Sequence, residues 1–195
     1  MDTDAIEVRD CTRCSALCES RSRIVNGVGA ADADLLFVGE APGENEDAEG
    51  EPFVGRSGDV LTDALRDRGL ARRDVRITNC VRCRPPENRD PTTEELANCR
   101  AYLEREIDAV DPEVVVTLGK VPSEHLLERS VAVTNEAGTL HDARIAGTAR
   151  RVLVCVHPAA TLYDPSQRET FADALDEAVS LIDDGESGQS RLGDF

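Results

Sequence analysis

The sequence predicts a three-layer α/β/α fold with a central, mainly parallel sheet of four strands. Four short, nearly continuous apolar runs alternate with segments whose apolar residues recur at helical spacing. The apolar runs cover 35–38, 75–79, 114–118 and 152–156. Strands that are apolar on both faces are typical of parallel sheets covered by helices on both sides. The carboxyl ends of these strands should meet at one edge of the sheet, where α/β proteins bind ligands.

The first strand, Leu35–Val38, leads into a long polar loop that contains Glu40, Glu46 and Phe53. An amphipathic helix over about 57–68 follows the loop. Long loops in compact domains are usually functional, so this loop is the first candidate for a site.

The second strand ends at Asn79 and is followed by a proline-rich loop. Thr92 and Glu95 then form a Thr-x-x-Glu capping box, which predicts the start of a helix. The third strand is followed by Lys120 and a further helix, and the segment 130–150 should be irregular or form a hairpin.

The fourth strand ends at His157, and a last amphipathic helix follows it. We expect one domain over residues 1–183 and a disordered tail over 184–195, which is polar. Polar side chains would thus gather at one edge of the sheet: Glu40, Glu46, Asn79, Lys120 and His157. Each alone could simply cap a helix or turn, but their convergence favours an active site.

The composition is strongly acidic, with a formal net charge of -17 over 195 residues. Of the 22 basic residues, Lys120 is the only lysine. Such a surface suggests a protein kept soluble at high salt, as in halophilic archaea, and the alternative is an ordinary acidic cytosolic protein. The charge argues against general affinity for nucleic acid, so a DNA-binding function would need locally concentrated arginines.

The N-terminus is acidic and has no apolar core, and no apolar run is long enough to span a membrane. We therefore expect a cytoplasmic protein with no membrane partner, and a monomer. Its seven cysteines should be metal ligands or free thiols rather than disulfides.

Two pairs of cysteines could hold a structural zinc ion or an iron–sulfur cluster. The pairs are Cys11 with Cys14, and Cys83 with Cys99. Cys18 and Cys80 are competing candidates, whereas Cys155 lies inside an apolar strand and should be a core residue.

Three segments resemble motifs of the family 4 uracil-DNA glycosylases, the iron–sulfur type found in archaea and thermophilic bacteria. They are GEAPGENEDAEGEPFVG, ITNCVRCRPPENRDPTTEELANC, and HPAA followed by PSQR. The resemblance extends to about residue 180. It implies a monofunctional hydrolase of base excision repair, which flips uracil out of DNA and hydrolyses its N-glycosidic bond. It also implies a structural [4Fe–4S] cluster on Cys11, Cys14, Cys83 and Cys99.

The resemblance further implies a uracil site made by Glu40, Ala41, Phe53, Asn79 and His157. Phe53 would stack on the flipped base, and the Asn79 amide would read N3–H and O4 together. His157 would be a neutral donor to uracil O2, where negative charge develops. Related enzymes carry a water-positioning Asp where this chain has Ala41, so Glu46 or Glu40 would take that task.

Contacts to the DNA backbone are expected from Pro42, Ser57, Arg84, Lys120, Pro158 and Arg168. For Arg89, an ion pair with the neighbouring Asp90 is as strong an expectation as a DNA contact. The tail residues Gln189, Leu192 and Phe195 resemble the peptide by which repair proteins bind the sliding clamp, although an inert tail is the simpler reading.

Two other functions compete with the glycosylase. One is a non-catalytic iron–sulfur protein that binds uracil-containing or single-stranded DNA. The other is a nucleotide-binding α/β protein with a structural zinc site. The absence of a GxxxxGK[ST] motif after the first strand argues against this second function.

Overall fold

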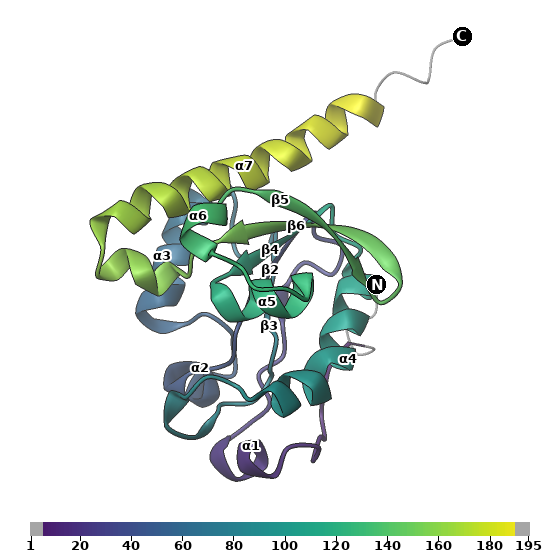
Figure 1. Cartoon of the computed structure of the whole chain (residues 1–195), viewed down its shortest axis with the longest axis vertical. Coiled ribbons are helices and arrows are strands. Elements are labelled where there is room, and N and C mark those ends of the chain that lie inside the picture. The colour runs from purple at the N-terminus through teal and green to yellow at the C-terminus, as the bar shows by residue number, and fades with distance from the viewer. Residues whose placement is uncertain (1–5, 190–195) are drawn as a thin grey trace.

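The computed structural model describes residues 6–189, with side chains described up to residue 182. Its centre is a six-stranded sheet in the order β1-β3-β2-β4-β6-β5 (Figure 1). The strands are β1 (Val28–Gly29), β2 (Leu35–Gly39), β3 (Arg76–Asn79), β4 (Val114–Leu118), β5 (Leu140–Ile145) and β6 (Thr148–Cys155). The predicted four-stranded sheet is therefore too small.

The four predicted strands form the parallel centre of this sheet, β3-β2-β4-β6, so the mainly parallel arrangement is confirmed. The two additional strands lie at the edges, where β1 pairs antiparallel with β3 and β5 pairs antiparallel with β6. Strand β1 has only two residues, too few to produce an apolar pattern. Strand β5 belongs to a hairpin closed by Ala146 and Gly147, both at positive φ, as two-residue hairpin loops require.

The helices are α1 (Ser15–Ser20), α2 (Glu44–Glu49), α3 (Gly55–Arg66), α4 (Thr93–Val110), α5 (Lys120–Leu127), α6 (Val133–Glu136) and α7 (Pro165–Gln189). Two 3₁₀ helices, η2 (Pro86–Asn88) and η3 (Pro158–Leu162), follow β3 and β6. The predicted capping box of α4 is present, with Thr92 accepting from Glu95 N and the Glu95 carboxylate accepting from Thr92 N.

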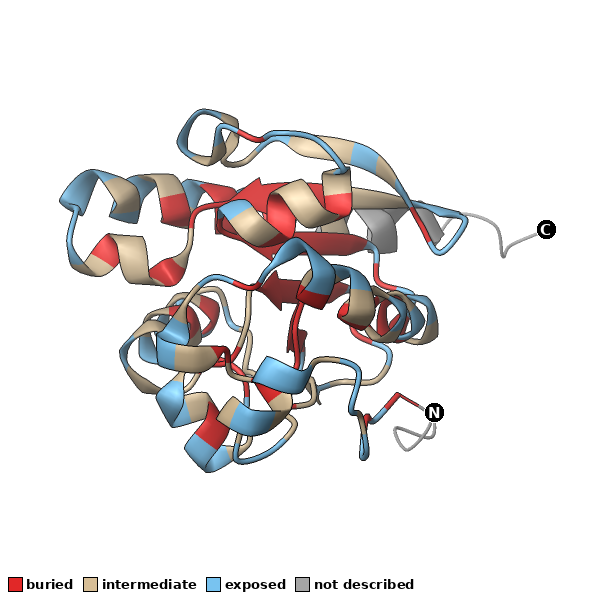
Figure 2. Cartoon of the chain, turned by 60° about the horizontal axis from the view of Figure 1, so that its bottom comes forward, coloured by how far each residue is buried: buried red, intermediate tan, exposed pale blue. Residues whose placement is uncertain are grey.

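Successive residues of the buried strands point to opposite faces of the sheet, which gives two apolar cores. Leu35 and Phe37 of β2 pack on the face covered by α3 and α7. Leu36 and Val38 pack on the other face, with side chains of α4, α5 and α1. The central strands are buried almost throughout (Figure 2), so the expected three layers are present.

A buried ion triad joins α4 to the strand and loop that carry Asn79. Glu106 is fully buried, and its carboxylate accepts from Arg76 Nε at 2.7 Å and from Arg82 Nη2. Arg76 and Arg82 are also almost completely buried. One carboxylate therefore serves two guanidinium groups that water does not reach.

The carboxyl ends of β2, β3 and β6 point to the same edge of the sheet. Strands β2 and β4 are neighbours at the centre of the sheet. The chain passes from β2 to β3 on one side of this pair and from β4 to β6 on the other side, so the direction of the connections reverses between β2 and β4. Ligands of open α/β sheets bind outside such a switch point. Glu40 directly follows β2, Asn79 is the last residue of β3, and His157 lies two residues after the end of β6, so all three lie at this edge of the sheet.

Helix α7 continues to Gln189, so the backbone over 184–189 is helical where a disordered tail was expected. Of the proposed clamp-binding residues, Leu192 and Phe195 lie outside the described residues, and only the backbone of Gln189 is described. Within 6–189, no helix has both the length and the apolar character needed to cross a membrane.

We predict that Glu106→Ala destabilises the fold by about 3–5 kcal/mol, because it leaves two buried guanidinium groups without their carboxylate. Urea denaturation measures the change in the free energy of unfolding. The matched control is Glu104→Ala, also on α4, whose carboxylate pairs with Arg100 at 2.7 Å and is 29% exposed. That variant should lose less than about 1 kcal/mol, and equal losses in the two variants would contradict the prediction.

Candidate active site

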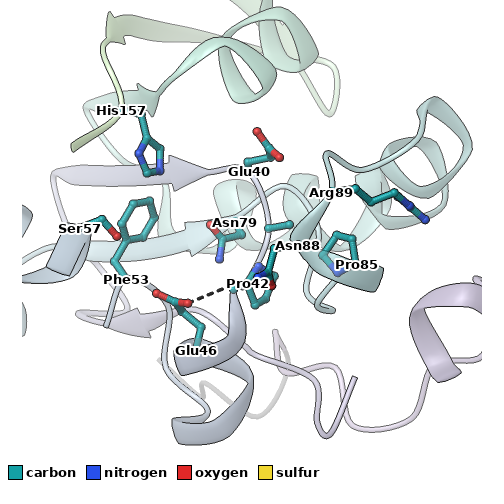
Figure 3. A pocket seen from close by; sticks show the side chains of 12 residues that line it. Glu40, Pro42, Glu46, Phe53, Ser57, Asn79, Pro85, Asn88, Arg89 and His157 are labelled. Carbon is teal, nitrogen blue, oxygen red and sulfur yellow. Dashed lines mark hydrogen bonds between the residues drawn. The ribbon is translucent and has the colours of Figure 1, made fainter. Parts of the chain in front are cut away.

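A cavity opens at the carboxyl edge of the sheet and is lined by side chains from several loops (Figure 3). Its lining comprises Glu40, Ala41, Pro42, Gly43, Glu46, Phe53, Ser57, Asn79, Pro85, Asn88, Arg89 and His157. The structure thus brings together all five residues predicted to bind the base, together with Pro42, Glu46 and Ser57. Pro85 and Asn88 are lining residues that the sequence analysis did not identify as site residues.

The floor of the cavity depends on Gly39, the last residue of β2. A Cβ atom at this position would lie 2.4 Å from Asn79 Oδ1 and 2.5 Å from the Phe53 ring. Any other residue would therefore displace the ring or the amide.

Phe53 has a backbone conformation that is unusual for a side chain of its size, with φ at 53°. Arg72 stabilises this turn by donating to Pro52 O at 2.7 Å and to Phe53 O at 3.1 Å. Gly58 packs so closely that a Cβ atom there would lie 1.8 Å from Phe53 O. The ring is thus held in a fixed position at the cavity wall.

Asn79 is 3% exposed, and its side-chain amide points into the cavity (Figure 3). Among the described residues, its amide oxygen and nitrogen have no hydrogen-bond partner within the protein. The amide faces the cavity, so it is available to a ligand that supplies both a donor and an acceptor.

His157 is a neutral hydrogen-bond donor in this cavity. Its Nδ1 accepts from Ala159 N at 3.1 Å, which leaves the proton of the neutral ring on Nε2. Burial lowers the pKa of His157 to about 4, so the ring is uncharged at neutral pH. The centroid of the ring lies 5.7 Å from that of Phe53, with an angle of 31° between the planes.

Glu46 fixes the shape of the first loop. Its carboxylate accepts from Gly43 N at 3.0 Å and from Val54 N at 3.1 Å, which ties the start of α2 to the start of α3 through one side chain. Each carboxylate oxygen still has a lone pair free to accept from a ligand or water in the cavity.

Glu40 is half-buried at the opposite side of the cavity. Burial raises the pKa of its carboxyl to about 7, and repulsion by Asp90 and a hydrogen bond with that side chain add to the increase. Glu40 therefore changes its charge near neutral pH.

The side chains predicted to contact the DNA backbone are divided between the cavity and its surroundings. Pro42 and Ser57 line it, whereas the others do not: Arg84, Lys120, Pro158 and Arg168. Lys120 is the exposed first residue of α5, and Arg84 donates to Asn88 Oδ1 at 2.8 Å. Arg89 contributes to the lining, but its guanidinium forms a bidentate pair with Glu95.

The four cysteines of the two predicted pairs line a second, smaller cavity between α1, α4 and the loop after β3. The cavity is lined by Cys11, Cys14, Cys83 and Cys99, and also by Cys18. Cys80 is completely buried in the same apolar core as Cys83 and Cys99 but does not line this cavity, and Cys155 is a core residue as expected. The cysteines are free thiols in the described structure.

The surroundings of this cavity suit thiolate ligands. Arg21 donates to Cys83 Sγ at 2.9 Å and to Cys11 O at 2.6 Å, and Asn98 approaches Cys14 Sγ at 3.5 Å. These donors would stabilise negative charge on sulfur. Over the described range, however, no group of three or more His, Cys, Asp or Glu side chains is arranged to hold a single metal ion.

Comparison with known proteins gives consistent matches over nearly the whole chain. Residues 26–179 match the model of the uracil DNA glycosylase superfamily. The chain is 40% identical over 175 residues to the type-4 uracil-DNA glycosylase of Archaeoglobus fulgidus, covering 88% of this chain and 87% of the relative. It is 38% identical to that of Saccharolobus solfataricus, covering 99% and 98%. It is 42% identical to that of Sulfurisphaera tokodaii, covering 86% and 78%.

We predict that Glu40→Gln stabilises the protein above pH 7 but not below pH 4.5, the ordinary value for this carboxyl. Between these values the folded state holds a proton that the unfolded chain releases, so the stability of the wild type falls as the pH rises. Gln cannot ionise, so the variant escapes this loss, which is on the order of 1 kcal/mol after allowance for solvent screening.

Urea denaturation at a pH on each side of this window measures the difference. Glu44→Gln is the control, because the Glu44 side chain is 75% exposed and should show no pH-dependent gain. Equal stability of Glu40→Gln and wild type above pH 7 would rule out the raised pKa.

Proposed function

The chain belongs to the uracil-DNA glycosylase superfamily, and we propose that it is a type-4 uracil-DNA glycosylase that acts in base excision repair. It would hydrolyse the N-glycosidic bond of uracil in DNA and leave an abasic site. The observation that carries the proposal is the pairing of an unpartnered, buried amide, Asn79, with a neutral donor, His157, in one cavity. The type-4 relatives support the same activity.

Base selection would come from Asn79. Uracil presents N3–H as a donor and O4 as an acceptor, and one amide offers the complement to both. Cytosine presents an acceptor at N3 and a donor at N4, so the same amide would meet two mismatches if its position is fixed. Sites built to satisfy buried polar groups reject such analogues strongly.

The base must leave the helical stack to reach the cavity. The Phe53 ring would then stack on the flipped uracil. Because Arg72 and Gly58 hold the turn at Phe53, the ring is already in place before the base arrives.

Bond cleavage leaves negative charge on the departing uracil. His157 would donate from Nε2 to uracil O2, where that charge develops. A neutral donor becomes more strongly bound as the charge forms, so it stabilises the transition state more than the bound substrate.

The attacking water needs an acceptor near the sugar, and Ala41 has no polar side chain for this task. We propose that Glu46 holds the water, because its carboxylate lies at the cavity wall and is fixed by Gly43 N and Val54 N. Glu40 would contact the base and shape the loop, and when ionised it would also stabilise positive charge on the sugar.

The DNA backbone would lie across the rim of the cavity. Pro42 and Ser57 line the cavity itself, while Arg84, Lys120, Pro158 and Arg168 would contact phosphates farther out. Lys120 begins α5, and helix N-termini favour phosphate.

We also propose a [4Fe–4S] cluster bound by Cys11, Cys14, Cys83 and Cys99. A cluster supplies a covalent cross-link among its ligands, and here it would join the N-terminal segment to the loop after β3 and to α4. Its role would be structural. Cys18 lies beside these residues but would not be a ligand.

Two further proposals concern the cellular setting. The acidic, lysine-poor composition supports activity at high salt. The sequence Gln189-x-x-Leu192-x-x-Phe195 supports binding to a sliding clamp. Calorimetry with the clamp should show weaker binding for a chain that ends at Gly188, and equal affinities would remove the clamp proposal.

An assay of base release tests the function. The purified protein is incubated with an oligonucleotide that contains one uracil, over a range of salt concentrations, and the product is treated with alkali. We expect strand cleavage at the uracil and none at cytosine or thymine. Binding without cleavage at every salt concentration would instead favour a non-catalytic uracil-DNA-binding protein.

We predict that His157→Ala lowers the single-turnover rate about 100- to 1,000-fold, the usual effect of losing one donor to a developing anion. Asn79→Ala should also lose most of the activity, because the base edge is no longer read. His141→Ala is the control, since His141 lies on β5 and does not line the cavity. Unchanged rates for either cavity variant would refute its role.

We predict that Cys83→Ala loses iron and the visible absorbance of a cluster, whereas Cys80→Ala and Cys18→Ala retain both. The Cys80→Ala variant controls for the loss of a buried thiol from the same loop. The Cys18→Ala variant controls for the loss of a thiol that lines the same cavity. Iron content per chain and thermal unfolding are the measurements. Loss of iron in Cys18→Ala would show that the ligand set is different.

A further inference from the structure

One peptide unit at the wall of the cavity, between Phe53 and Val54, is held at both ends by charged side chains. Its carbonyl, Phe53 O, accepts from Arg72 Nη1 at 3.1 Å. Its amide, Val54 N, donates to Glu46 Oε1 at 3.1 Å. Phe53 and Glu46 both line the cavity (Figure 3), whereas Arg72 does not. The same peptide therefore connects a side chain outside the cavity to two side chains inside it.

The conformation of Phe53 depends on its surroundings. With φ at 53° the residue lies in the left-handed region, which is unfavourable for a bulky side chain. Such conformations persist only where the surrounding structure enforces them, and they are common at ligand sites. Arg72 contributes a second bond to this turn, from Nη2 to Pro52 O at 2.7 Å. Loss of both bonds would allow the turn to relax toward negative φ, which would move the ring.

Arg72 is itself held in place by a turn between α3 and β3. Asp74 N donates to Ala71 O at 2.9 Å, and Ala71 N donates to the Asp74 carboxylate at 2.8 Å. Strand β1 packs closely against this turn, because a Cβ atom on Gly29 would lie 2.8 Å from Arg72 O. The guanidinium thus reaches the cavity wall from a rigid support.

The guanidinium also acts on Glu46 through the shared peptide. A carbonyl that accepts from a cation polarises its peptide, so the N–H at the other end becomes a stronger donor to a carboxylate. In the described part of the chain, no hydrogen bond or ion pair joins Arg72 to Glu46 directly. Since Gly43 N holds the other oxygen of Glu46, the bond from Val54 N sets the direction of the carboxylate.

We propose that Arg72 is a positioning residue for base release and acts through the Phe53–Val54 peptide. It would hold the Phe53 ring ready to stack on the base and the Glu46 carboxylate ready to hold the water. Arg72 itself would touch neither. The inference rests on the proposed glycosylase function.

The test measures uracil binding and bond cleavage separately. Calorimetry with free uracil reports on the stacking ring, and the single-turnover rate on saturating uracil-containing oligonucleotide reports on cleavage. We expect Arg72→Ala to weaken uracil binding about tenfold and to lower the rate about tenfold. Arg72→Lys should lose less in both measurements, because its ammonium can still donate to one of the carbonyls. Arg73→Ala is the control and should match wild type, since Arg73 is 87% exposed and its ion pair is with the adjacent Asp74.

Double variants distinguish positioning from a general loss of structure, because residues that act as one unit have effects that do not add. Combining Arg72→Ala with Phe53→Ala should weaken uracil binding little beyond Phe53→Ala alone. Combining it with Glu46→Ala should lower the rate little beyond Glu46→Ala alone. Full additivity in either combination would overturn the proposal. Melting temperatures show whether each variant folds, and if Arg72→Ala does not, the same combinations are made with Arg72→Lys.

The two readouts also separate this proposal from the glycosylase function. Abasic product from wild type, with unchanged uracil affinity in Arg72→Ala, refutes the positioning role alone. Weaker uracil binding by Arg72→Ala, without abasic product from wild type, refutes the glycosylase activity alone.

Discussion

The active site depends on a close approach at the end of β2, where Gly39 has no side chain. The Phe53 ring and the Asn79 amide occupy the space that a Cβ atom would need. This contact brings the loop after β2 against the end of β3, so the two groups proposed to stack on the base and to read it are set by one backbone position. Because protein interiors deform little, adding even a methyl group at Gly39 would displace both the Phe53 ring and the Asn79 amide.

Burial then determines the charge of the groups around this contact. His157 is neutral because its ring is largely buried, and its tautomer is fixed by Ala159 N. Glu40 keeps its proton up to about pH 7 for the same reason, with Asp90 adding repulsion. The protein as a whole carries a formal charge of -17, but the hydrogen-bond donor that faces the base, His157, is uncharged. Its selectivity would come from unsatisfied hydrogen bonds rather than from net attraction.

The sequence was sufficient for the parts of the fold that follow a period or a motif. Four apolar runs predicted the parallel centre of the sheet. Because Asn79 and His157 each stand at the end of a predicted strand, the sequence also predicted that they lie close together, and both residues line the same cavity.

The remaining parts depend on contacts between distant residues, which no local pattern encodes. Strand β1 exists only because Val28 and Gly29 pair with β3. Arg72 reaches back to the carbonyls of Pro52 and Phe53. Arg89 forms its ion pair with Glu95 across the start of α4, and it donates to its neighbour Asp90 at the backbone carbonyl. Helix α2 was missed because its sequence, ENEDAE, has almost no apolar face.

The two cavities are linked by a short stretch of chain, Asn79 to Cys83. Cys80 N donates to Gly39 O at 2.9 Å and Val81 N to Glu40 O at 3.0 Å, so the stretch continues the pairing of β3 with β2 beyond the sheet. Arg82 is then fixed by the buried carboxylate of Glu106.

On the other side of the cysteine-lined cavity, the N-terminal segment contacts the first loop through Ser22 N, which donates to the buried Asp47 of α2 at 2.8 Å. Any group that ties Cys11 and Cys14 to Cys83 and Cys99 therefore holds both walls of the active site: Asn79 through the chain, and the Glu46 loop through α2. A purely structural cross-link at this place would still affect base recognition, because the walls it joins are the ones that position Asn79 and Glu46.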